Sequence, residues 1–267
     1  MLEAVYNLFF HSLRSYPGPK LWAVSRIPYA RISLSGQGHR KMLELHKVYG
    51  PIIRIGPDAV SYSHPEAMNA IRGHRRSGMT EHGKDPDLFG FQRLSILGAD
   101  RENHRRYRQV LAHGFSAQTM LEQQPIIKSY IDTFITRIRE ESTGGTQLID
   151  IVKWYNYTTF DIIGDLAFGE PFGCLQGSTY HPLVSMIFSS VKALAISVHL
   201  ERILRHFQTL KRLFIPKNLE ITRIVSKQLA EAKVRKRLAI ETNRPDFINA
   251  MIKRSGSRGK VSKLLCP

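Results

Sequence analysis

Cysteine is nearly absent from this chain of 267 residues, which contains only Cys174 and Cys266. Two thiols so far apart cannot form the disulfide framework of a small secreted domain. The sequence is therefore typical of a reducing compartment, or of thiols that face the cytosol. No histidine or cysteine accompanies either thiol at the spacing of zinc ligands, so we expect no metal site.

Long hydrophobic runs are missing from the N-terminus. Leu8 to Phe10 are followed at once by His11 and Arg14, whereas a helix that spans a bilayer needs about 20 consecutive apolar residues. A secretory signal needs a basic start and a longer apolar stretch, but the chain begins with Met1 to Glu3. We predict no transmembrane helix, and a location in the cytoplasm or peripherally on a membrane.

The signatures of common hydrolases and dehydrogenases are also missing. The sequence contains no P-loop, no G-x-S-x-G motif and no H-E-x-x-H motif, and Gly36-Gln37-Gly38 lacks the third glycine of a dinucleotide site. Asp161 and Asp165 lie one helical turn apart, but no nucleophile accompanies them. We predict no catalytic residues and interpret the two aspartates as a solvated or ion-paired face.

Positive charge is abundant and concentrated near the C-terminus. Residues 201–267 contain 17 Lys and Arg against 5 Asp and Glu, a net charge of +12 out of +17 for the whole chain. Four apolar residues lie among these cations and suit contact with an anionic membrane: Leu210, Leu213, Phe214 and Ile215. A solvated basic helix is the alternative. We expect no nucleic-acid binding, because no recognition motif accompanies the basic pI.

Periodicity predicts a mainly α-helical chain with one β-hairpin. The hairpin is expected from Ile52 to Ile55 and from Ala59 to Tyr62. Helices are expected over 38–49, 65–71, from Pro125 to the Gly144-Gly145 stop, from an Asp150 cap to Phe168, over 182–199, and over 219–240 behind an Asn218 cap. Residues 73–97 are expected to form a long functional loop.

His104 and Arg108 share one helix face with Leu111 and Phe115, because residues four apart lie one above the other. This stripe predicts a cation that points inward. A buried guanidinium needs an anion, which either the protein or the carboxylate of a bound cofactor can supply. An internal ion pair, or a side chain that extends to water, remains the alternative.

The run from Ala99 to Ser116 resembles the C-helix of fungal cytochrome P450 monooxygenases, in which an aromatic residue or histidine, followed four residues later by arginine, holds the haem propionates. This resemblance gives His104 and Arg108 a cofactor-binding role. Three further stretches are similar to the same family in the same order: the proline-rich hinge at Asn7 to Trp22, the first hairpin at Tyr49 to Tyr62, and the end of the E helix at Phe160 to Gly173.

The resemblance implies a mainly α fold with a small β-hairpin, the N-terminal half of the cytochrome P450 fold, truncated before its long central helix. We expect a hinge or anchor remnant over 1–25, a partial P450 domain over 26–260 and an aberrant tail over 261–267. The loop over 83–97 is expected to cover the substrate with Phe89, Phe91, Leu94 and Ile96. The apolar residues at 210–215 correspond to the F–G loop, which dips into the membrane in this family.

Intact members of this family use haem, molecular oxygen and NADPH-cytochrome P450 reductase to hydroxylate lipophilic small molecules, often in fungal secondary metabolism, at the cytosolic face of the endoplasmic reticulum. Their iron is held by cysteinate in a Phe-x-x-Gly-x-Arg-x-Cys-x-Gly loop, which is absent here. We therefore expect a chain that is inactive alone and does not bind haem stably. A separately encoded C-terminal half, or a non-enzymatic basic membrane-surface protein, are the alternatives.

Overall fold

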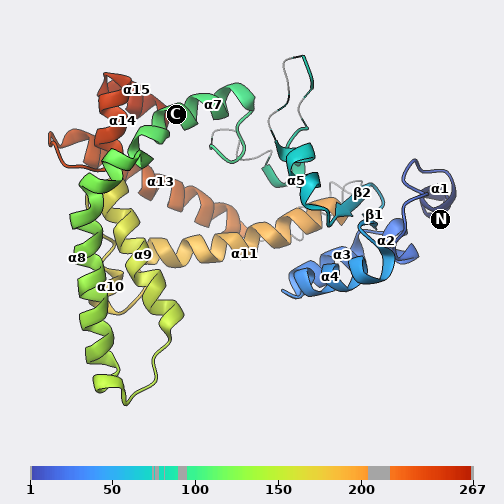
Figure 1. Cartoon of the computed structure of the whole chain (residues 1–267), viewed down its shortest axis with the longest axis horizontal. Coiled ribbons are helices and arrows are strands. Elements are labelled where there is room, and N and C mark those ends of the chain that lie inside the picture. Colours follow the sequence, from blue (N-terminus) through green and yellow to red (C-terminus); the bar gives the residue numbers. More distant parts are fainter. Residues whose placement is uncertain are drawn as a thin grey trace. The chain divides into compact units, whose positions relative to one another are not determined.

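A computed structural model describes residues 2–73, 75, 78–80, 82–89, 95–203 and 217–265 of the chain (Figure 1). The chain divides into two compact units. Unit 1 comprises Met1–Gly90 and Lys192–Pro216, and unit 2 comprises Phe91–Val191 and Lys217–Pro267. Each unit therefore combines segments that are distant in sequence, and each is described by itself below.

Unit 1 contains short helices and a two-stranded sheet. Its elements are α1 (Leu2–Phe9), α2 (Lys20–Val24), α3 (Ile27–Leu34), α4 (Gly38–Tyr49), β1 (Ile52–Gly56), β2 (Ala59–Tyr62), α5 (Pro65–Arg72), α6 (Pro86–Phe89) and the second half of α11 (Pro182–Ile203). Strands β1 and β2 are antiparallel, with Ile53 opposite Ser61 and an irregularity between Arg54 and Gly56. The predicted hairpin and the predicted helix over 38–49 are confirmed.

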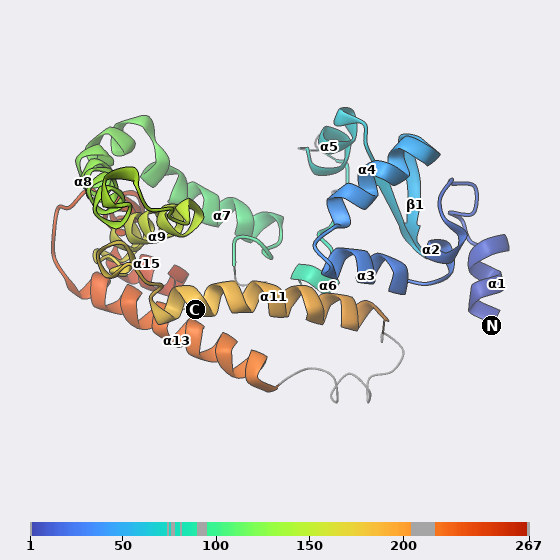
Figure 2. The same ribbon diagram turned by 90° about the horizontal axis from the view of Figure 1, so that it is seen from below.

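The core of unit 1 is small. Trp22, Leu45 and Ile53 are buried together, and the partly buried rings and aliphatic chains of α3 and α4 pack on them. Helices α3 and α4 contact each other and α4 also contacts β1, as Figure 2 shows. Ile53 and Ile55 both contribute to this core, because side chains two residues apart lie on the same face of a strand.

Arg54 in β1 ties the N-terminal segment to the hairpin. Its side chain is 3% exposed and donates hydrogen bonds to the carbonyls of Asn7 (2.8 Å), Gly56 (3.2 Å) and Pro57. Burial lowers the pKa of Arg54. Because no carboxylate among the described residues accepts from this guanidinium, three backbone carbonyls compensate the buried charge, and the carbonyl of Asn7 fixes α1 to the sheet.

The proline-rich hinge runs along the same strand. The backbone N–H of Arg54 donates to the carbonyl of Pro17 at 2.7 Å. Gly18 approaches so closely, with φ +155°, that a Cβ there would lie 2.4 Å from the carbonyl oxygen of Arg54. Only glycine fits this position, because any side chain would collide with backbone.

Unit 2 is a helical assembly. Its elements are α7 (Arg101–Ala112), the 3-10 turn η2 (His113–Phe115), α8 (Ala117–Glu141), the 3-10 turn η3 (Thr143–Gly145), α9 (Ile151–Phe168), α10 (Cys174–Gly177), the first half of α11, α13 (Lys217–Ala239), α14 (Phe247–Ser255) and α15 (Arg258–Leu265). Helices α8 and α9 lie side by side (Figure 1). Five buried residues form the core beside them: Trp154, Tyr157, Cys174, Leu175 and Val184.

The predicted ends of α9 are confirmed. The carboxylate of Asp150 accepts the backbone N–H of Val152 at 3.1 Å, and Gly169 ends the helix in the left-handed conformation, with φ +76°. Caps are local signals, because the residues that form them are close in sequence. The mainly α fold with a small β-hairpin is likewise confirmed.

Two predicted helix starts are wrong. Helix α8 begins at Ala117, where the hydroxyl of Ser116 accepts the backbone N–H of Thr119, and Pro125 lies inside it. Proline removes the hydrogen bond to the carbonyl four residues earlier, but Leu121 is exposed and water can bind that carbonyl. Helix α13 begins at Lys217, one residue before the Asn218 expected as its cap.

Helix α11 is long and apolar enough to cross a membrane by length and composition alone. Of its most apolar stretch, 22% is buried within the described structure. The prediction of no transmembrane helix does not account for this helix. Core helices of soluble proteins meet the same criterion, so it does not assign a location.

His199 joins α11 to α3 inside unit 1. Its side chain is buried, its Nε2 lies 2.9 Å from the hydroxyl of Ser33 in a hydrogen bond, and its ring meets the ring of Tyr29 edge to face. Arg202, one turn further along α11, pairs with Asp85. Burial, and then the positive charge of Arg202, lower the pKa of His199.

We expect unit 1 to lose stability as the pH falls below about 6.5, the pKa of an unfolded histidine. The lowered pKa keeps His199 neutral in the folded state, so below that pH the unfolded chain binds a proton that the folded chain does not. Urea unfolding at a series of pH values measures this loss. The His199→Gln variant, which cannot titrate, should show a flatter dependence, and an unchanged dependence would contradict the assignment.

Candidate functional site

Helix α7 carries the residues predicted to bind a cofactor. The helix begins at Asp100, whose carboxylate accepts the backbone N–H of Asn103 at 2.8 Å, a bond that lowers the pKa of Asp100. Tyr107 is its buried residue, and α7 packs against α14. The side of α7 that includes Tyr107 therefore faces unit 2, which leaves the rest of the helix surface less covered.

His104 and Arg108 lie on one face of α7, as predicted, but the burial predicted for the arginine is wrong. His104 is partly buried and Arg108 is exposed. No residue in the described ranges covers the guanidinium closely enough to bury it, and it forms neither a hydrogen bond nor an ion pair with any of them. Further along the stripe, Phe115 packs against Phe247 of α14, with ring centroids 4.7 Å apart.

The donor set on this face fits an acidic ligand. An arginine without an internal partner offers five N–H groups in a planar fork that matches carboxylate geometry. The imidazole of His104, four residues earlier, adds a further donor or acceptor one turn away. Haem carries two carboxylates, so its acidic side chains are compatible with this pair, and the cofactor role of both residues stays a prediction.

The thiol of Cys174 is unsuited to binding iron. Cys174 is 1% exposed within the core of unit 2, and its sulfur accepts the backbone N–H of His181 at 3.3 Å. Burial raises the pKa of this thiol, so it stays protonated. Cys266 lies outside the described residues. Within the described ranges, no group of three or more His, Cys, Asp or Glu side chains could hold a metal ion.

Of the other predicted site residues, the structure describes only two. Phe89 ends α6 in unit 1, Ile96 lies in a turn of unit 2, and both are partly buried. Phe91 and Leu94 lie outside the described residues, as do all four predicted membrane contacts: Leu210, Leu213, Phe214 and Ile215. The substrate-lining and membrane-contact roles therefore stay predictions.

Asp161 and Asp165 have structural partners. Asp161 is 2% exposed and accepts the backbone N–H groups of Cys174 (3.0 Å) and Leu175 (2.8 Å), so it fixes the start of α10. Asp165 pairs with Arg244 at 2.6 Å and accepts the hydroxyl of Tyr130 at 2.9 Å. Burial, together with this carboxylate, raises the pKa of Tyr130. The predicted ion-paired role is confirmed for Asp165, whereas Asp161 is buried rather than solvated.

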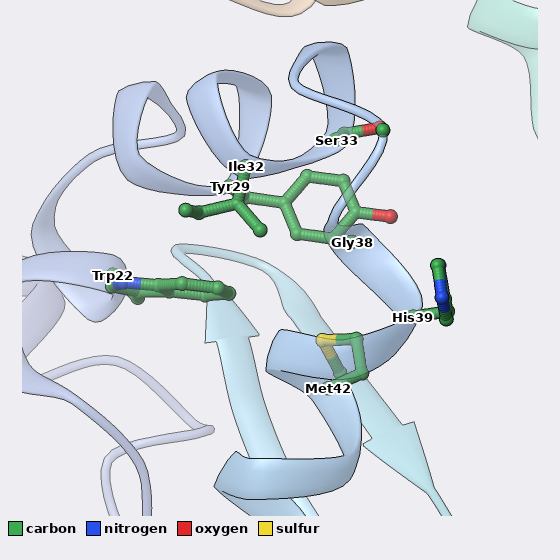
Figure 3. Close-up of a pocket in the computed structure, with 8 residues that line it drawn as sticks. Trp22, Tyr29, Ile32, Ser33, Gly38, His39 and Met42 are labelled. Atoms are coloured by element: carbon green, nitrogen blue, oxygen red, sulfur yellow. The ribbon is translucent and has the colours of Figure 1, made fainter.

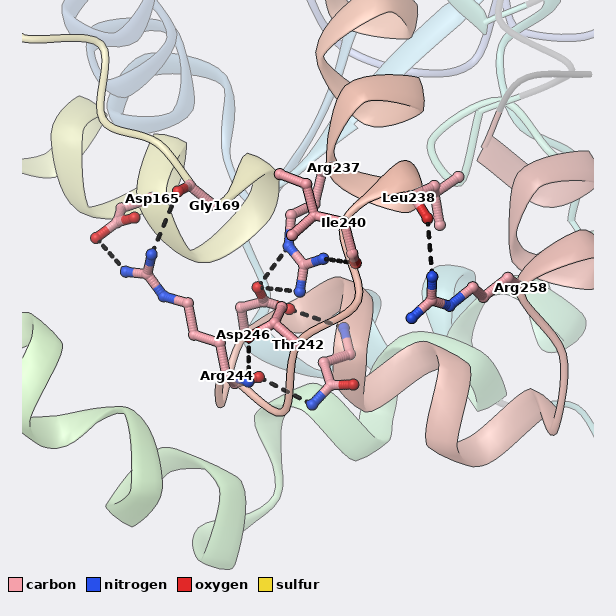
Figure 4. Close-up of polar contacts among 10 residues, drawn as sticks. Asp165, Gly169, Arg237, Leu238, Ile240, Thr242, Arg244, Asp246 and Arg258 are labelled. Atoms are coloured by element: carbon pink, nitrogen blue, oxygen red, sulfur yellow. Dashed lines mark hydrogen bonds and ion pairs between the residues drawn. The ribbon is translucent and has the colours of Figure 1, made fainter.

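A second ion pair lies beside the first and is fully buried (Figure 4). Arg237 of α13 and Asp246, the cap of α14, are 2% and 0% exposed, and Nε and Nη2 of the arginine lie 2.8 and 2.7 Å from Oδ2 of the aspartate. The other carboxylate oxygen accepts the backbone N–H of Asn249 at 2.7 Å. A Cβ at Gly169 would lie 2.7 Å from Cδ of Arg237, so the glycine makes room for the arginine.

Sequence reasoning missed this cluster. Arg237 sits in a run of lysines and arginines, which is typical of a solvated face. The available signal was Asp246 directly before Phe247 and Ile248, because aspartate before an apolar helical segment is a typical N-cap.

Unit 1 contains a small cavity of about 360 Å³ (Figure 3). Trp22, Tyr29, His39 and Met42 surround it. None of the residues predicted for the site lines this cavity, so it does not extend the candidate cofactor site on α7.

A family model described as Cytochrome P450 matches residues 16–265 of the chain. The chain is similar to the trichothecene C-15 hydroxylase of Fusarium sporotrichioides, with 51% identity over 259 residues, which cover 97% of this chain and 52% of that protein. It is also similar to the cytochrome P450 monooxygenase astJ of Aspergillus oryzae, with 44% identity over 260 residues. These residues cover 96% of this chain and 51% of that protein.

A third relative aligns with this chain over a similar number of residues. The averantin hydroxylase of Dothistroma septosporum is 42% identical over 261 residues, which cover 97% of this chain and 48% of that protein. The chain thus spans about half the length of the curated relatives it matches.

We expect Asp246→Asn to lower the free energy of unfolding by about 3–5 kcal/mol, because it leaves the charge of Arg237 buried without its partner. The matched control is Asp132→Asn, which removes an exposed carboxylate 2.6 Å from Lys128 and should cost less than about 1 kcal/mol. Chemical denaturation measures both. Equal losses in the two variants would contradict the special role of the buried pair.

Proposed function

The chain belongs to the cytochrome P450 family, and we propose that it is the N-terminal half of a fungal-type haem-thiolate monooxygenase that has no oxygenase activity alone. The family match over residues 16–265 supports this proposal, together with the span of about half of each relative. The family match is the single observation that carries the proposal, and Arg108, which has no hydrogen-bond or ion-pair partner among the described residues, is compatible with it.

The reaction class follows from the relatives. Two of them are named as hydroxylases, of a trichothecene and of averantin. We infer that this chain, together with the remainder of a haem pocket, takes part in hydroxylation of a lipophilic small molecule in fungal secondary metabolism. Phe89 and Ile96 are apolar and suit contact with such a substrate, as do Phe91 and Leu94.

The role of α7 in that reaction is to hold and orient the cofactor. When bound, haem supplies the activation of molecular oxygen, which a thiolate ligand favours. Arg108 would bind a propionate of the haem through its planar fork of N–H donors, and His104 would add a hydrogen-bonding group one turn away. Because both side chains project from one helix, their role would be to orient the haem and not to transfer protons.

We propose that the thiolate is not supplied by this sequence, which lacks the cysteine loop that holds iron in the family. The thiol of Cys174 is buried, protonated and bonded to the backbone of His181, so it does not serve as the iron ligand. The family takes its electrons from a redox partner, and we propose that a reductase serves the completed enzyme. The inactivity of the isolated chain follows from the missing sulfur ligand.

Contact with a membrane is the second part of the proposal. The net charge of +12 over residues 201–267 favours an anionic surface, and the four apolar residues between 210 and 215 suit insertion beneath its head groups. A non-enzymatic membrane-surface protein would use the same charge, so a lipid-binding test alone does not separate it from the enzyme half.

We expect the isolated chain, mixed with haem, reduced and treated with carbon monoxide, to show no thiolate-type Soret band. Co-expression with the C-terminal half of a relative should restore haem retention. In that complex, Arg108→Ala should weaken haem retention about tenfold, because a charge-assisted hydrogen bond is lost.

The matched control is Arg105→Ala, which removes another exposed cation of α7 that lies off the His104 face. Equal effects of the two variants would refute the role of Arg108. A thiolate-type band from the chain alone would refute its inactivity.

Binding to vesicles that contain anionic lipid should weaken as salt is raised and after Phe214→Glu, because both changes oppose insertion into a negatively charged interface. Sedimentation of the protein with the vesicles measures this. Leu148→Glu, at an apolar residue that is fully exposed in unit 2, is the control and should change binding little. Binding that responds to neither salt nor Phe214→Glu would exclude membrane contact through this region.

A further inference from the structure

A buried histidine attaches the end of α11 to α3 within unit 1. His199 lies four residues before the last residue of α11 and is 8% exposed. Its Nε2 bonds to the hydroxyl of Ser33, and its ring lies edge to face with that of Tyr29, with centroids 5.7 Å apart. Tyr29 in turn meets Trp22 of the unit 1 core, with centroids 6.1 Å apart (Figure 3). Residues of this chain therefore already bury the imidazole and connect it to the core.

The charges around His199 are already balanced. A cavity of about 600 Å³ lies beside the imidazole within unit 1, and three cations and three carboxylates line it: Arg26, Arg72, Arg202, Asp58, Asp85 and Asp87. Asp58 pairs with Arg26, whereas Asp85 and Asp87 pair with Arg202. A proton on His199 would add a fourth positive charge beside carboxylates that are each bound to an arginine.

The site favours the neutral ring over the charged ring. The pKa of His199 is lowered, first by burial and then by the charge of Arg202 one turn away. The hydroxyl of Ser33 can donate to the neutral ring or accept from the protonated ring, so charge decides between the two forms. Once the ring leaves α3, water can solvate the charge. Protonation therefore favours a state in which the end of α11 has separated from α3.

This separation can remain local. His199 and Arg202 bond to side chains of the first 90 residues, and both lie within the last five residues of α11. The ion pair between Arg202 and Asp85 is partly exposed, and such pairs contribute about 1 kcal/mol or less. The end of a helix opens at a lower free energy than a whole unit. Loss of the His199 contact can thus free this end and leave α4 and the hairpin in place.

We propose that His199 is a pH-sensitive switch: the neutral ring holds the end of α11 on α3, and protonation of the ring releases it. The step is the reversible transfer of one proton from solvent to the imidazole, and no covalent bond of the chain breaks. The switch requires neither haem nor a C-terminal half, so its test is independent of the proposed function.

Amide hydrogen exchange of the full chain at pH 7.5 and pH 5.5, corrected for the intrinsic exchange rates, tests the switch. We expect the protection of residues 195–203 to fall about tenfold between these two pH values, because opening takes up one proton on a histidine with a free pKa of about 6.5. The hairpin should stay better protected than this segment at both pH values. Protection of residues 195–203 that is independent of pH, or equal to that of the hairpin at pH 5.5, would overturn the switch.

Variants of the ring separate its charge from its other contacts. His199→Gln keeps a polar group toward Ser33 but cannot take up a proton, so protection of residues 195–203 should no longer depend on pH. His199→Lys carries a charge at both pH values and should show the low protection already at pH 7.5. His46→Gln is the matched control, because His46 is a partly buried histidine of unit 1 whose Nε2 also lies 2.9 Å from a serine hydroxyl, that of Ser61. This control should retain the tenfold loss.

Circular dichroism of each variant verifies that the helices are retained. A tenfold loss that persists in His199→Gln, or that disappears in His46→Gln, would show that another group senses the pH and would overturn the assignment. If His199→Lys does not fold, the comparison of the two glutamine variants still decides.

Discussion

The ion pair between Arg237 and Asp246 is the interaction on which unit 2 depends most. A buried pair of opposite charges needs close contact and additional hydrogen bonds to offset the loss of water. Asp246 meets this requirement by accepting from Arg237 with one oxygen and capping α14 with the other. Arg244, two residues earlier, binds Asp165 and the carbonyl of Gly169 on α9. The short segment before α14 thus connects α9, α13 and α14 through charge rather than through apolar packing.

Local features of the fold could be predicted from the sequence because their causes are local. The Asp150 cap, the Gly169 stop and the turn between β1 and β2 each depend on residues within a few positions of one another. The start of α8 could not be placed, because a proline inside a helix gives the same signal as a proline at its first turn. The Arg237–Asp246 pair could not be predicted either, since burial within a basic run depends on how α13 packs.

In the candidate site, too, the features with local causes could be predicted and those that depend on packing could not. Helical spacing was sufficient to place His104 and Arg108 on one face of α7, and similarity to known relatives supports the family. Spacing could not show that Arg108 is exposed, because exposure depends on which other segments cover the helix. The sequence also did not predict that Asp161 is buried, because its partners are backbone N–H groups at the start of α10.

The hydrogen bond between Ser33 and His199 joins residues 166 positions apart, within a unit that otherwise consists of the first 90 residues. During synthesis from the N-terminus, α3 leaves the ribosome long before α11 exists. Until α11 has been synthesised, the early helices and the hairpin therefore lack this contact, and the ring of Tyr29 lacks its neighbour His199. Non-local closure of this kind slows folding and exposes the nascent chain to chaperones and proteases during that interval.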